Sequence, residues 1–305
     1  MKMETTIGCV IVTYNRLEKL KRTLFAYASQ LLKPIFLIVV DNASTDQTAS
    51  FLDQWQKVDE GFKKIVIHSN KNLGGSGGFY IGEKEAMKLN SDWIMIADDD
   101  AYPEKNYIYG LQSYINNHDT MDISILCGKV FENGKYESIH RSVWRSKWDR
   151  NFHCPVKEEE YSNKEFCPDF VSYIGIVINK AKMRRTGLVC KDNFIWCDDT
   201  EHTYRLSLYG KIICLPEYTI IHDVDPSNHA LSWKSYYGYR NDLVFLKKHL
   251  KSHFPFIVMK LVLKTLMCPL HGRTVAEFKL RMDAIYDAIF NHLGINDRYK
   301  PGWKP

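Results

Sequence analysis

Residues Asp92–Glu104, with the sequence DWIMIADDDAYPE, contain an apolar run that stops abruptly at three carboxylates, Asp98 to Asp100. The apolar part, Trp93–Ala97, has the length and flanking turn residues of a buried strand. Adjacent carboxylates repel one another unless a cation lies among them, and Mg²⁺ prefers carboxylate oxygens together with substrate phosphates. Open α/β sheets also bind ligands where their strands end. The stretch therefore predicts a cation site at a sheet edge, and an acidic loop without a ligand is the alternative.

Three further apolar runs precede this stretch, and each also ends in polar residues. The runs are Ile7–Val12 before Thr13-Tyr14-Asn15-Arg16, Phe36–Val40 before Asp41-Asn42, and Ile65–His68 before Asn70, Asn72 and Gly74-Gly75-Ser76-Gly77-Gly78. Segments with helical spacing separate the runs, which indicates a parallel sheet with right-handed crossovers. All four polar clusters should then lie along one edge of the sheet and form a composite binding site.

Two of these clusters have more than one interpretation. A carboxylate at the position of Asp41 often accepts hydrogen bonds from a nucleoside, but a helix cap or turn fits Asp41-Asn42 equally well. The glycines between residues 74 and 78 form neither a GxGxxG fingerprint nor a phosphate-binding P-loop. Four glycines in five residues predict a loop whose backbone packs closely against another group, with free amides at a helix start, and a flexible linker is the alternative.

The second half of the chain contains a second acidic cluster. Residues 193–201 (NFIWCDDTE) lead into a predicted helix, whose start would be stabilised by its acids. An aspartate held there beneath an aromatic side chain is equally suited to act as a general base. His222 follows the last predicted strand, where it has either a structural role or completes an oxygen-rich metal site. The aromatic residues between Trp144 and Phe166 suit either sugar stacking or a small packed subdomain.

The charge of the 305-residue chain is unevenly distributed. From Leu231 onward there are 13 Lys and Arg against 5 Asp and Glu, whereas the preceding part has 28 against 31. This pattern argues against a general nucleic-acid binder and indicates a basic face for an anionic surface or ligand, with a solvated basic helix pair as the alternative. Phe254–Leu270 is apolar but includes Lys260 and Lys264. We expect an amphipathic helix that packs on the body, pairs with a second subunit or lies in a membrane interface.

The cysteines and the N-terminal run indicate the compartment. None of the eight cysteines forms a CxxC pair, which fits a reducing cytoplasm better than a zinc site or redox dithiol. Ile7–Val12 is too short for the apolar core of a signal peptide, and we expect it to form a strand.

Together these segments resemble an inverting glycosyltransferase of family 2 with the GT-A fold. The resemblance extends from Val10 to about Asn241 and includes TYNR, Asp41-Asn42, NLGGSGGF, DDD, WCDDTE and His222. Within the family, NLGGSGGF, DDD and the W-x-DD-x-E-like element resemble galactofuranosyltransferases and related rhamnosyltransferases, as does the YYGYRN segment ending at Asn241. The implied architecture is α/β, with a Rossmann-like, mostly parallel sheet flanked by helices and a helical C-terminal extension. The implied domains are residues 1–230, divided into a nucleotide-binding half (1–121) and an acceptor and catalytic half (122–230), and a basic region, 231–305.

The resemblance also implies roles for individual residues. Asp199 would be the general base, with Asp198 as the alternative because the family commonly has Glu-Asp before the base helix. Asp98, Asp100 and His222 would hold Mg²⁺ or Mn²⁺. Donor binding is implied for Thr13, Tyr14, Asn15, Arg16, Asp41, Asn42, Asn72, Gly74, Gly75, Gly77, Gly78, Asp98 and Asp99. Acceptor binding is implied for Trp196, Asp198, Glu201 and Arg205.

The implied reaction is a metal-dependent, inverting transfer of galactofuranose from UDP-galactofuranose to a hydroxyl of a growing surface glycan. The alternatives are a rhamnosyltransferase that uses dTDP-rhamnose and an inactive carbohydrate-binding or scaffold subunit. A nucleotidyltransferase is disfavoured because Cys9–Arg16 lacks a glycine-rich triphosphate loop. We expect a cytoplasmic protein. Three points stay open: whether the acceptor is lipid-linked, whether the C-terminal region contacts the inner membrane face, and whether the chain forms homo-oligomers.

Overall fold

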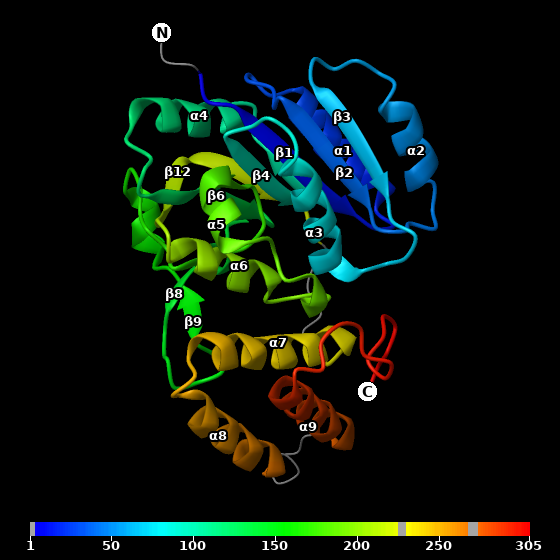
Figure 1. Cartoon of the computed structure of the whole chain (residues 1–305), viewed down its shortest axis with the longest axis vertical. Helices are drawn as coiled ribbons and strands as arrows, with labels where there is room; N and C mark the ends of the chain where they lie inside the picture. The colour runs from blue at the N-terminus through cyan, green and yellow to red at the C-terminus, as the bar shows by residue number, and fades with distance from the viewer. Residues whose placement is uncertain (1–3, 225–229, 268–273) are drawn as a thin grey trace.

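The computed structural model describes residues 4–224, 230–267 and 274–305 of the chain. Within these residues, nine strands form one large sheet in the order β3-β2-β1-β4-β11-β6-β12-β5, with β7 paired to β6 (Figure 1). Its strands are β1 (Ile7–Thr13), β2 (Phe36–Asp41), β3 (Lys63–His68), β4 (Trp93–Asp98), β5 (Ala101–Pro103), β6 (Ile123–Glu132), β7 (Lys135–Tyr136), β11 (Ile176–Asn179) and β12 (Lys211–His222). A smaller sheet comprises β10 (Phe170–Val171), β8 (Arg141–Trp144) and β9 (His153–Pro155).

Helices cover both faces of the large sheet and form the C-terminal part of the chain (Figure 1). They are α1 (Leu17–Ala28), α2 (Thr48–Trp55), α3 (Gly74–Ala86), α4 (Tyr107–Asn117), α5 (Lys180–Thr186), α6 (Asp198–Ser207), α7 (Trp233–His249), α8 (Phe254–Leu266) and α9 (Val275–Phe290). Short 3₁₀ turns span Ser138–His140, Glu158–Ser162 and Lys191–Asn193. In the described part of the chain, no helix combines the length and apolar character needed to cross a membrane.

The sheet is mostly parallel, as predicted. The strands β3, β2, β1 and β4 are parallel neighbours. The next strand, β11, is antiparallel to both β4 and β6, so β6 runs in the same direction as β4, and β12 is parallel to β6. The carboxyl ends of the parallel strands therefore meet at one edge, where Thr13 pairs with Asp41 and Val12 pairs with Asp98. The expected alignment of polar strand ends is thus confirmed.

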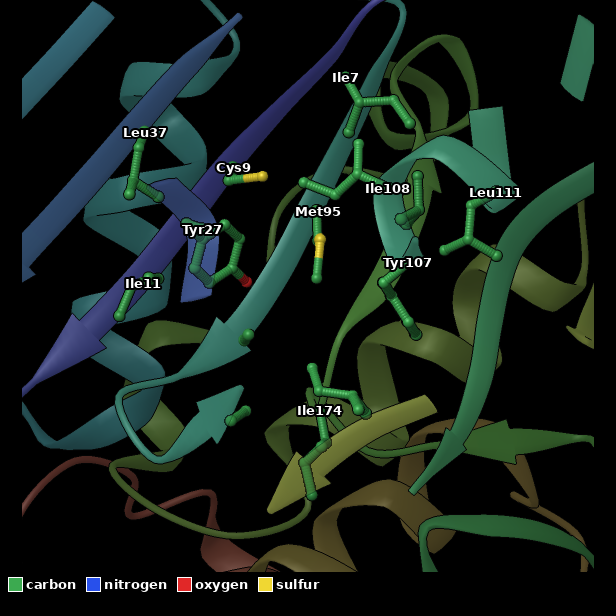
Figure 2. Close-up of a cluster of buried hydrophobic side chains, with 14 of the residues drawn as sticks. Ile7, Cys9, Ile11, Tyr27, Leu37, Met95, Tyr107, Ile108, Leu111 and Ile174 are labelled. Atoms are coloured by element: carbon green, nitrogen blue, oxygen red, sulfur yellow. The ribbon is translucent and has the colours of Figure 1, made fainter. Parts of the chain in front are cut away.

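Alternating side chains of the central strands pack in two cores on opposite faces of the sheet. Figure 2 shows one core, in which Cys9 and Ile11 of β1 and Met95 of β4 lie near Tyr27 of α1 and Ile108 of α4. The other core unites residues such as Val10 and Ile96 with residues of α3, α5 and α6. Because successive residues of a strand point to opposite faces, a buried parallel strand is apolar throughout, which explains the continuous runs in the sequence.

The glycine segment 74–78 differs from the expected loop, because it forms the first turns of α3. Gly74 has a φ of +72°, and a Cβ there would lie 1.9 Å from the carbonyl oxygen of Phe194. A Cβ on Gly78 would lie 2.5 Å from Cγ1 of Val12. Tertiary packing therefore overrides the low helix propensity of glycine here. The prediction of close backbone packing is confirmed, whereas the prediction of a loop is wrong.

The C-terminal helices group at the end of the molecule away from α4 (Figure 1). The side chains of α7, α8 and α9 share an apolar cluster with Phe152 and Phe170, which anchors this region to the smaller sheet. The predicted apolar segment Phe254–Leu270 ends as a helix at Leu266, and its residues 268–270 lie outside the described residues.

Candidate active site

The three consecutive aspartates lie at the tight connection between β4 and β5. Asp98 ends β4 and is partly exposed, whereas Asp99 and Asp100 are only 3% and 2% exposed. Asp99 accepts hydrogen bonds from Oγ1 of Thr13 (2.7 Å) and Nη1 of Arg16 (3.3 Å). Burial raises the pKa of Asp99 to about 6, although Arg16 and Thr13 oppose the rise. Asp99, which follows β4, is therefore linked to the last residue of β1 and to Arg16 beyond it.

Asp98, Asp100 and His222 come together in the geometry of a cation site. One ligand atom from each lies within 4.8 Å of the other two. Arg16 donates to Oδ2 of Asp100 (2.7 Å), but Oδ1 of Asp100 is buried without a hydrogen-bond partner and lies 3.5 Å from Nε2 of His222. Burial and the nearby charge of Asp100 raise the pKa of Asp98 to about 8. Crowded carboxylates with an unused oxygen fit a hard divalent cation, which would favour their ionised forms.

His222 is oriented by a second carboxylate, that of Glu132. Oε2 of Glu132 lies 2.9 Å from Nδ1 of His222 and 3.0 Å from Nε2 of His140. In neutral His222 with its proton on Nδ1, Nε2 would keep a lone pair for a cation held between it and Asp100. Nδ1 of His140 lies 3.0 Å from Oγ of Ser172, and burial lowers the pKa of His140 to about 4. Ligand atoms of Glu132, His140 and His222 also lie within 4.8 Å of one another, but the hydrogen bonds of Glu132 to both histidines fit a role in positioning His222.

The second acidic pair lies at the start of α6, after a loop with unusual backbone geometry. Phe194, Trp196 and Cys197 have φ values of 68°, 65° and 62°, which non-glycine residues adopt rarely. Asp198 is buried, and its burial beside Asp199 raises its pKa to about 7. Asp199 accepts hydrogen bonds from N (2.6 Å) and Oγ1 (3.2 Å) of Thr200, and burial also raises its pKa. Two carboxylates of raised pKa beside a concave surface are candidates for proton transfer.

The YYGYRN segment supports this loop from α7. Nδ2 of Asn241 lies 2.9 Å from each of the carbonyl oxygens of Asn193, Ile195 and Trp196. Nη2 of Arg240 donates to the same oxygen of Asn193 (3.0 Å). Gly238 leaves room for the indole of Trp196, since a Cβ at this position would lie 2.8 Å from its Cε3. The segment therefore holds the backbone that carries the second acidic pair, a role that the sequence did not indicate.

Three neighbouring cavities, which share lining residues, lie along the two acidic sites. The first cavity has a volume of about 210 Å³, and we name it the nucleotide cavity only because many of its residues were predicted to bind the donor. It is lined by Val12, Thr13, Tyr14, Arg16, Asn42, Asn72, Gly74, Gly75, Asp98, Asp99, Phe194, Ile195, Trp233, Lys234 and Pro301. The carboxylate cavity, of about 440 Å³, shares Arg16, Gly75, Asp98, Ile195 and Lys234 with it and adds Asp100, His222, Asp198 and Asp199. The aromatic cavity, of about 560 Å³, shares His140, Ser172, Trp196, Cys197 and Asp199 with the carboxylate cavity and adds Arg150, Phe170, Tyr239 and Asp242.

Most of the residues predicted to bind the donor line the nucleotide cavity, but four do not. Asn15 is exposed, and its Oδ1 accepts a hydrogen bond from the backbone N–H of Thr45 (2.7 Å). Asp41 is buried and contacts the backbone N–H of Ser44 and Nδ1 of His68, each at 2.9 Å. Gly77 and Gly78 face Leu73 and Val12, respectively. In this structure these four residues contact other parts of the protein, and their contact with a donor remains a prediction.

The residues predicted to bind the acceptor also divide into two groups. Trp196, which is 47% exposed, and Asp198 line the cavities. Glu201 is buried, and its Oε1 lies near Nε of Arg205 (2.9 Å), Nζ of Lys248 (2.6 Å) and Nε2 of His249 (3.2 Å). Arg205 also donates to the carbonyl oxygen of Leu188 (2.8 Å). Glu201 and Arg205 thus join α6 to its neighbours, apart from the residues that line the three cavities.

Residues 9–175, more than half of the chain, match the family described as glycosyl transferase family 2. The chain therefore belongs to this family. Over 122 residues it is 36% identical to galactofuranosyltransferase GlfT1 from Mycolicibacterium smegmatis, a match that covers 39% of each chain. Over 103 residues it is 33% identical to galactofuranosyltransferase GlfT1 from Mycobacterium tuberculosis, and this match covers 33% of each chain. The matched regions thus span only 33–39% of the length of these relatives.

Solved structures support the predicted GT-A fold over almost the whole chain. One is GalNAc-T7 with UDP, GalNAc and Mn²⁺, with a TM-score of 0.65, 16% identity, and coverage of 93% of this chain and 55% of that chain. Another is residues 1–349 of S. aureus TarS in complex with UDP-GlcNAc, with a TM-score of 0.59, 17% identity, and coverage of 93% and 82%. At this identity the likeness concerns the fold alone.

Proposed function

We propose that the chain is a metal-dependent, inverting glycosyltransferase that transfers galactofuranose from UDP-galactofuranose to a hydroxyl of a growing surface glycan. The main support is a row of three cavities with shared lining residues, which extends from a candidate cation site past a candidate base to an aromatic pocket. The galactofuranosyltransferase relatives favour this donor over dTDP-rhamnose. A nucleoside diphosphate would lie across the nucleotide and carboxylate cavities, with its phosphates near Asp98 and Asp100.

Asp98, Asp100 and His222 are the residues that would hold Mg²⁺ or Mn²⁺ in this proposal. A divalent cation there would stabilise the negative charge that develops on the departing diphosphate. Asp199 lines both the carboxylate and the aromatic cavities, whereas Asp198 lines only the carboxylate cavity. Asp199 is therefore the better placed of the two to take the proton of an acceptor hydroxyl. The hydroxyl oxygen would attack the anomeric carbon as the bond to the diphosphate breaks, which inverts the anomeric centre.

The aromatic cavity is our proposed acceptor site. Trp196, which is 47% exposed, offers a ring surface against which a sugar can stack. Arg150 packs 4.0 Å over the ring of Tyr239 and forms an ion pair with Asp242, and these groups offer further polar contacts. In this proposal Glu201 and Arg205 act on the acceptor only by fixing α6. The division into residues 1–121, 122–230 and 231–305 also stays a proposal. The last of these parts supplies Trp233 and Lys234 to the donor side and Tyr239 and Asp242 to the acceptor side.

The function is tested by measuring UDP or dTDP release from UDP-galactofuranose, UDP-galactopyranose, UDP-glucose and dTDP-rhamnose with Mg²⁺ or Mn²⁺. We expect release from UDP-galactofuranose that EDTA abolishes and that added metal restores. Preference for dTDP-rhamnose would keep the chemistry and change the donor. Nucleotide binding without release from any donor, in the presence of candidate glycan acceptors, would instead support a carbohydrate-binding subunit.

We further propose that the acceptor is lipid-linked and that residues 231–305 contact the cytoplasmic membrane face.

A further inference from the structure

The helix α8 presents apolar side chains to solvent on its outward face. Phe256, Met259, Leu263 and Leu266 are each more than half exposed, and their spacing of three or four residues places them along one side of the helix. We call these four residues the apolar stripe. The opposite side of α8 is buried, with Ile257 in the cluster that it shares with α7 and α9. A surface helix of a soluble domain normally turns its polar side outward, so this arrangement indicates a partner for the stripe.

Trp148 extends the apolar stripe beyond the helix. It lies in the segment between β8 and β9 and is also more than half exposed. Its ring centroid is 6.0 Å from that of Phe256 and 4.1 Å from that of His253. Tryptophan is enriched at the boundary between lipid headgroups and acyl chains, where an apolar ring with one polar N–H is favoured.

The positive charges next to the stripe favour an anionic partner. Among the described residues, α8 contains Lys260 and Lys264 and no Asp or Glu, and the exposed Lys251 comes shortly before it. Lys260 and Lys264 are exposed on α8 itself. Lys260 pairs with Asp149 (2.8 Å), but both side chains are exposed, and such pairs are weak. A second copy docked stripe to stripe would bring these like charges together, whereas anionic lipid headgroups would neutralise them.

We infer that α8 and Trp148 form a membrane-binding surface that lies flat in the interface of a bilayer containing anionic lipids. The 13 residues of α8 span about 20 Å, which is too short to cross a hydrocarbon core of about 30 Å. The stripe would enter the boundary between headgroups and acyl chains, with Lys260 and Lys264 at the level of the headgroups. This inference rests on the membrane contact proposed above for residues 231–305 and names the residues that would make it. Vesicle binding can be measured independently of enzyme activity.

The test is sedimentation of the full chain with vesicles of phosphatidylcholine alone or mixed with phosphatidylglycerol, at low and high salt. We expect binding to the mixed vesicles that weakens as salt increases. Phe256→Ser with Leu263→Ser should reduce the partition coefficient by at least about tenfold. The matched control is Phe25→Ser with Met121→Ser, which removes two exposed apolar side chains elsewhere and should leave binding unchanged.

Donor hydrolysis by each variant is measured in parallel as a check of folding, so that failure of the proposed catalysis is seen separately from failure to bind vesicles. Unchanged vesicle binding by the stripe variant would overturn the inference. So would a wild-type chain that stays in the supernatant with the mixed vesicles. A wild-type dimer in light scattering that the stripe variant converts to a monomer would assign the stripe to a second copy instead.

Discussion

At the scale of single residues, the second acidic pair provides two carboxylates with different surroundings. Asp198 is buried and faces only the carboxylate cavity, whereas Asp199 also faces the aromatic cavity. We therefore expect Asp199→Asn to lower kcat by roughly 10²–10⁴-fold, the usual contribution of a positioned base, with little change in the Kd for UDP. Asp198→Asn is the matched comparison and should retain much more turnover. The reverse order in single-turnover assays would make Asp198 the base.

Glu132 provides a prediction about a residue that never touches the proposed cation. Its carboxylate accepts from both His222 and His140, and so keeps Nε2 of His222 directed at Asp100. Loss of such an orienting carboxylate typically weakens metal binding by about 10- to 100-fold. We expect Glu132→Gln to raise the Kd for Mn²⁺ in this range, measured by electron paramagnetic resonance with UDP present.

Glu137→Gln is the control for this measurement, since Glu137 pairs only loosely with Lys135 (3.7 Å). Equal Mn²⁺ affinities of the Glu132 and Glu137 variants would contradict the proposed role of Glu132 in positioning His222.

The sequence could not indicate Glu132, because a single glutamate at the end of a strand has no distinguishing pattern. Its role depends on the pairing of β6 with β12, which brings residues 132 and 222 together.

At the scale of secondary-structure elements, the contact between α7 and the loop before α6 is the one that we expect to affect catalysis most. The side-chain amide of Asn241 satisfies carbonyl groups of a loop in which several residues adopt positive φ. Asn241→Ala should leave these buried groups without a donor and lower the free energy of unfolding by about 2 kcal/mol. It should also reduce kcat more than UDP affinity, because the loop positions Asp199. Asn117→Ala, at an exposed helix end, is the control in denaturant titrations.

A selective effect of Asn241→Ala on kcat would distinguish positioning of the base from general stabilisation, which would lower kcat and nucleotide binding together.

The sequence reveals the strands and their polar ends well, because buried parallel strands require continuous apolar runs. It does not reveal the backbone of residues 194–197, since phenylalanine, tryptophan and cysteine carry no preference for positive φ. Nor does it show that α3 starts at Gly74, where packing against Phe194 outweighs glycine's poor helix propensity.

At the scale of the whole molecule, the candidate site is assembled from distant parts of the chain. The order of the strand-end clusters was predictable, because parallel connections bring consecutive strand ends to one edge. A metal site completed by His222 was one of two alternatives from the residues alone, and the family resemblance favoured it and named Asp98 and Asp100 as the partners. The entry of residues 233–242 into the cavities was not expected, because a basic, helical segment looks like an extension when only its composition and periodicity are considered. Its tertiary contacts make it part of the site.

Lys234 tests whether the C-terminal region completes the donor site. It lines both the nucleotide and carboxylate cavities, and burial lowers the pKa of its ammonium group even though Asp98 and Asp100 lie nearby. A partly buried cation at this place is suited to contact a phosphate, and such charge-assisted contacts are worth about 1.5–3 kcal/mol. We therefore expect Lys234→Ala to weaken UDP binding by at least about tenfold in titration calorimetry with Mg²⁺. Lys279→Ala, on the exposed side of α9, should leave the affinity unchanged. If both variants bind UDP like the wild type, residues 231–305 support the acceptor side and membrane contact without binding the donor.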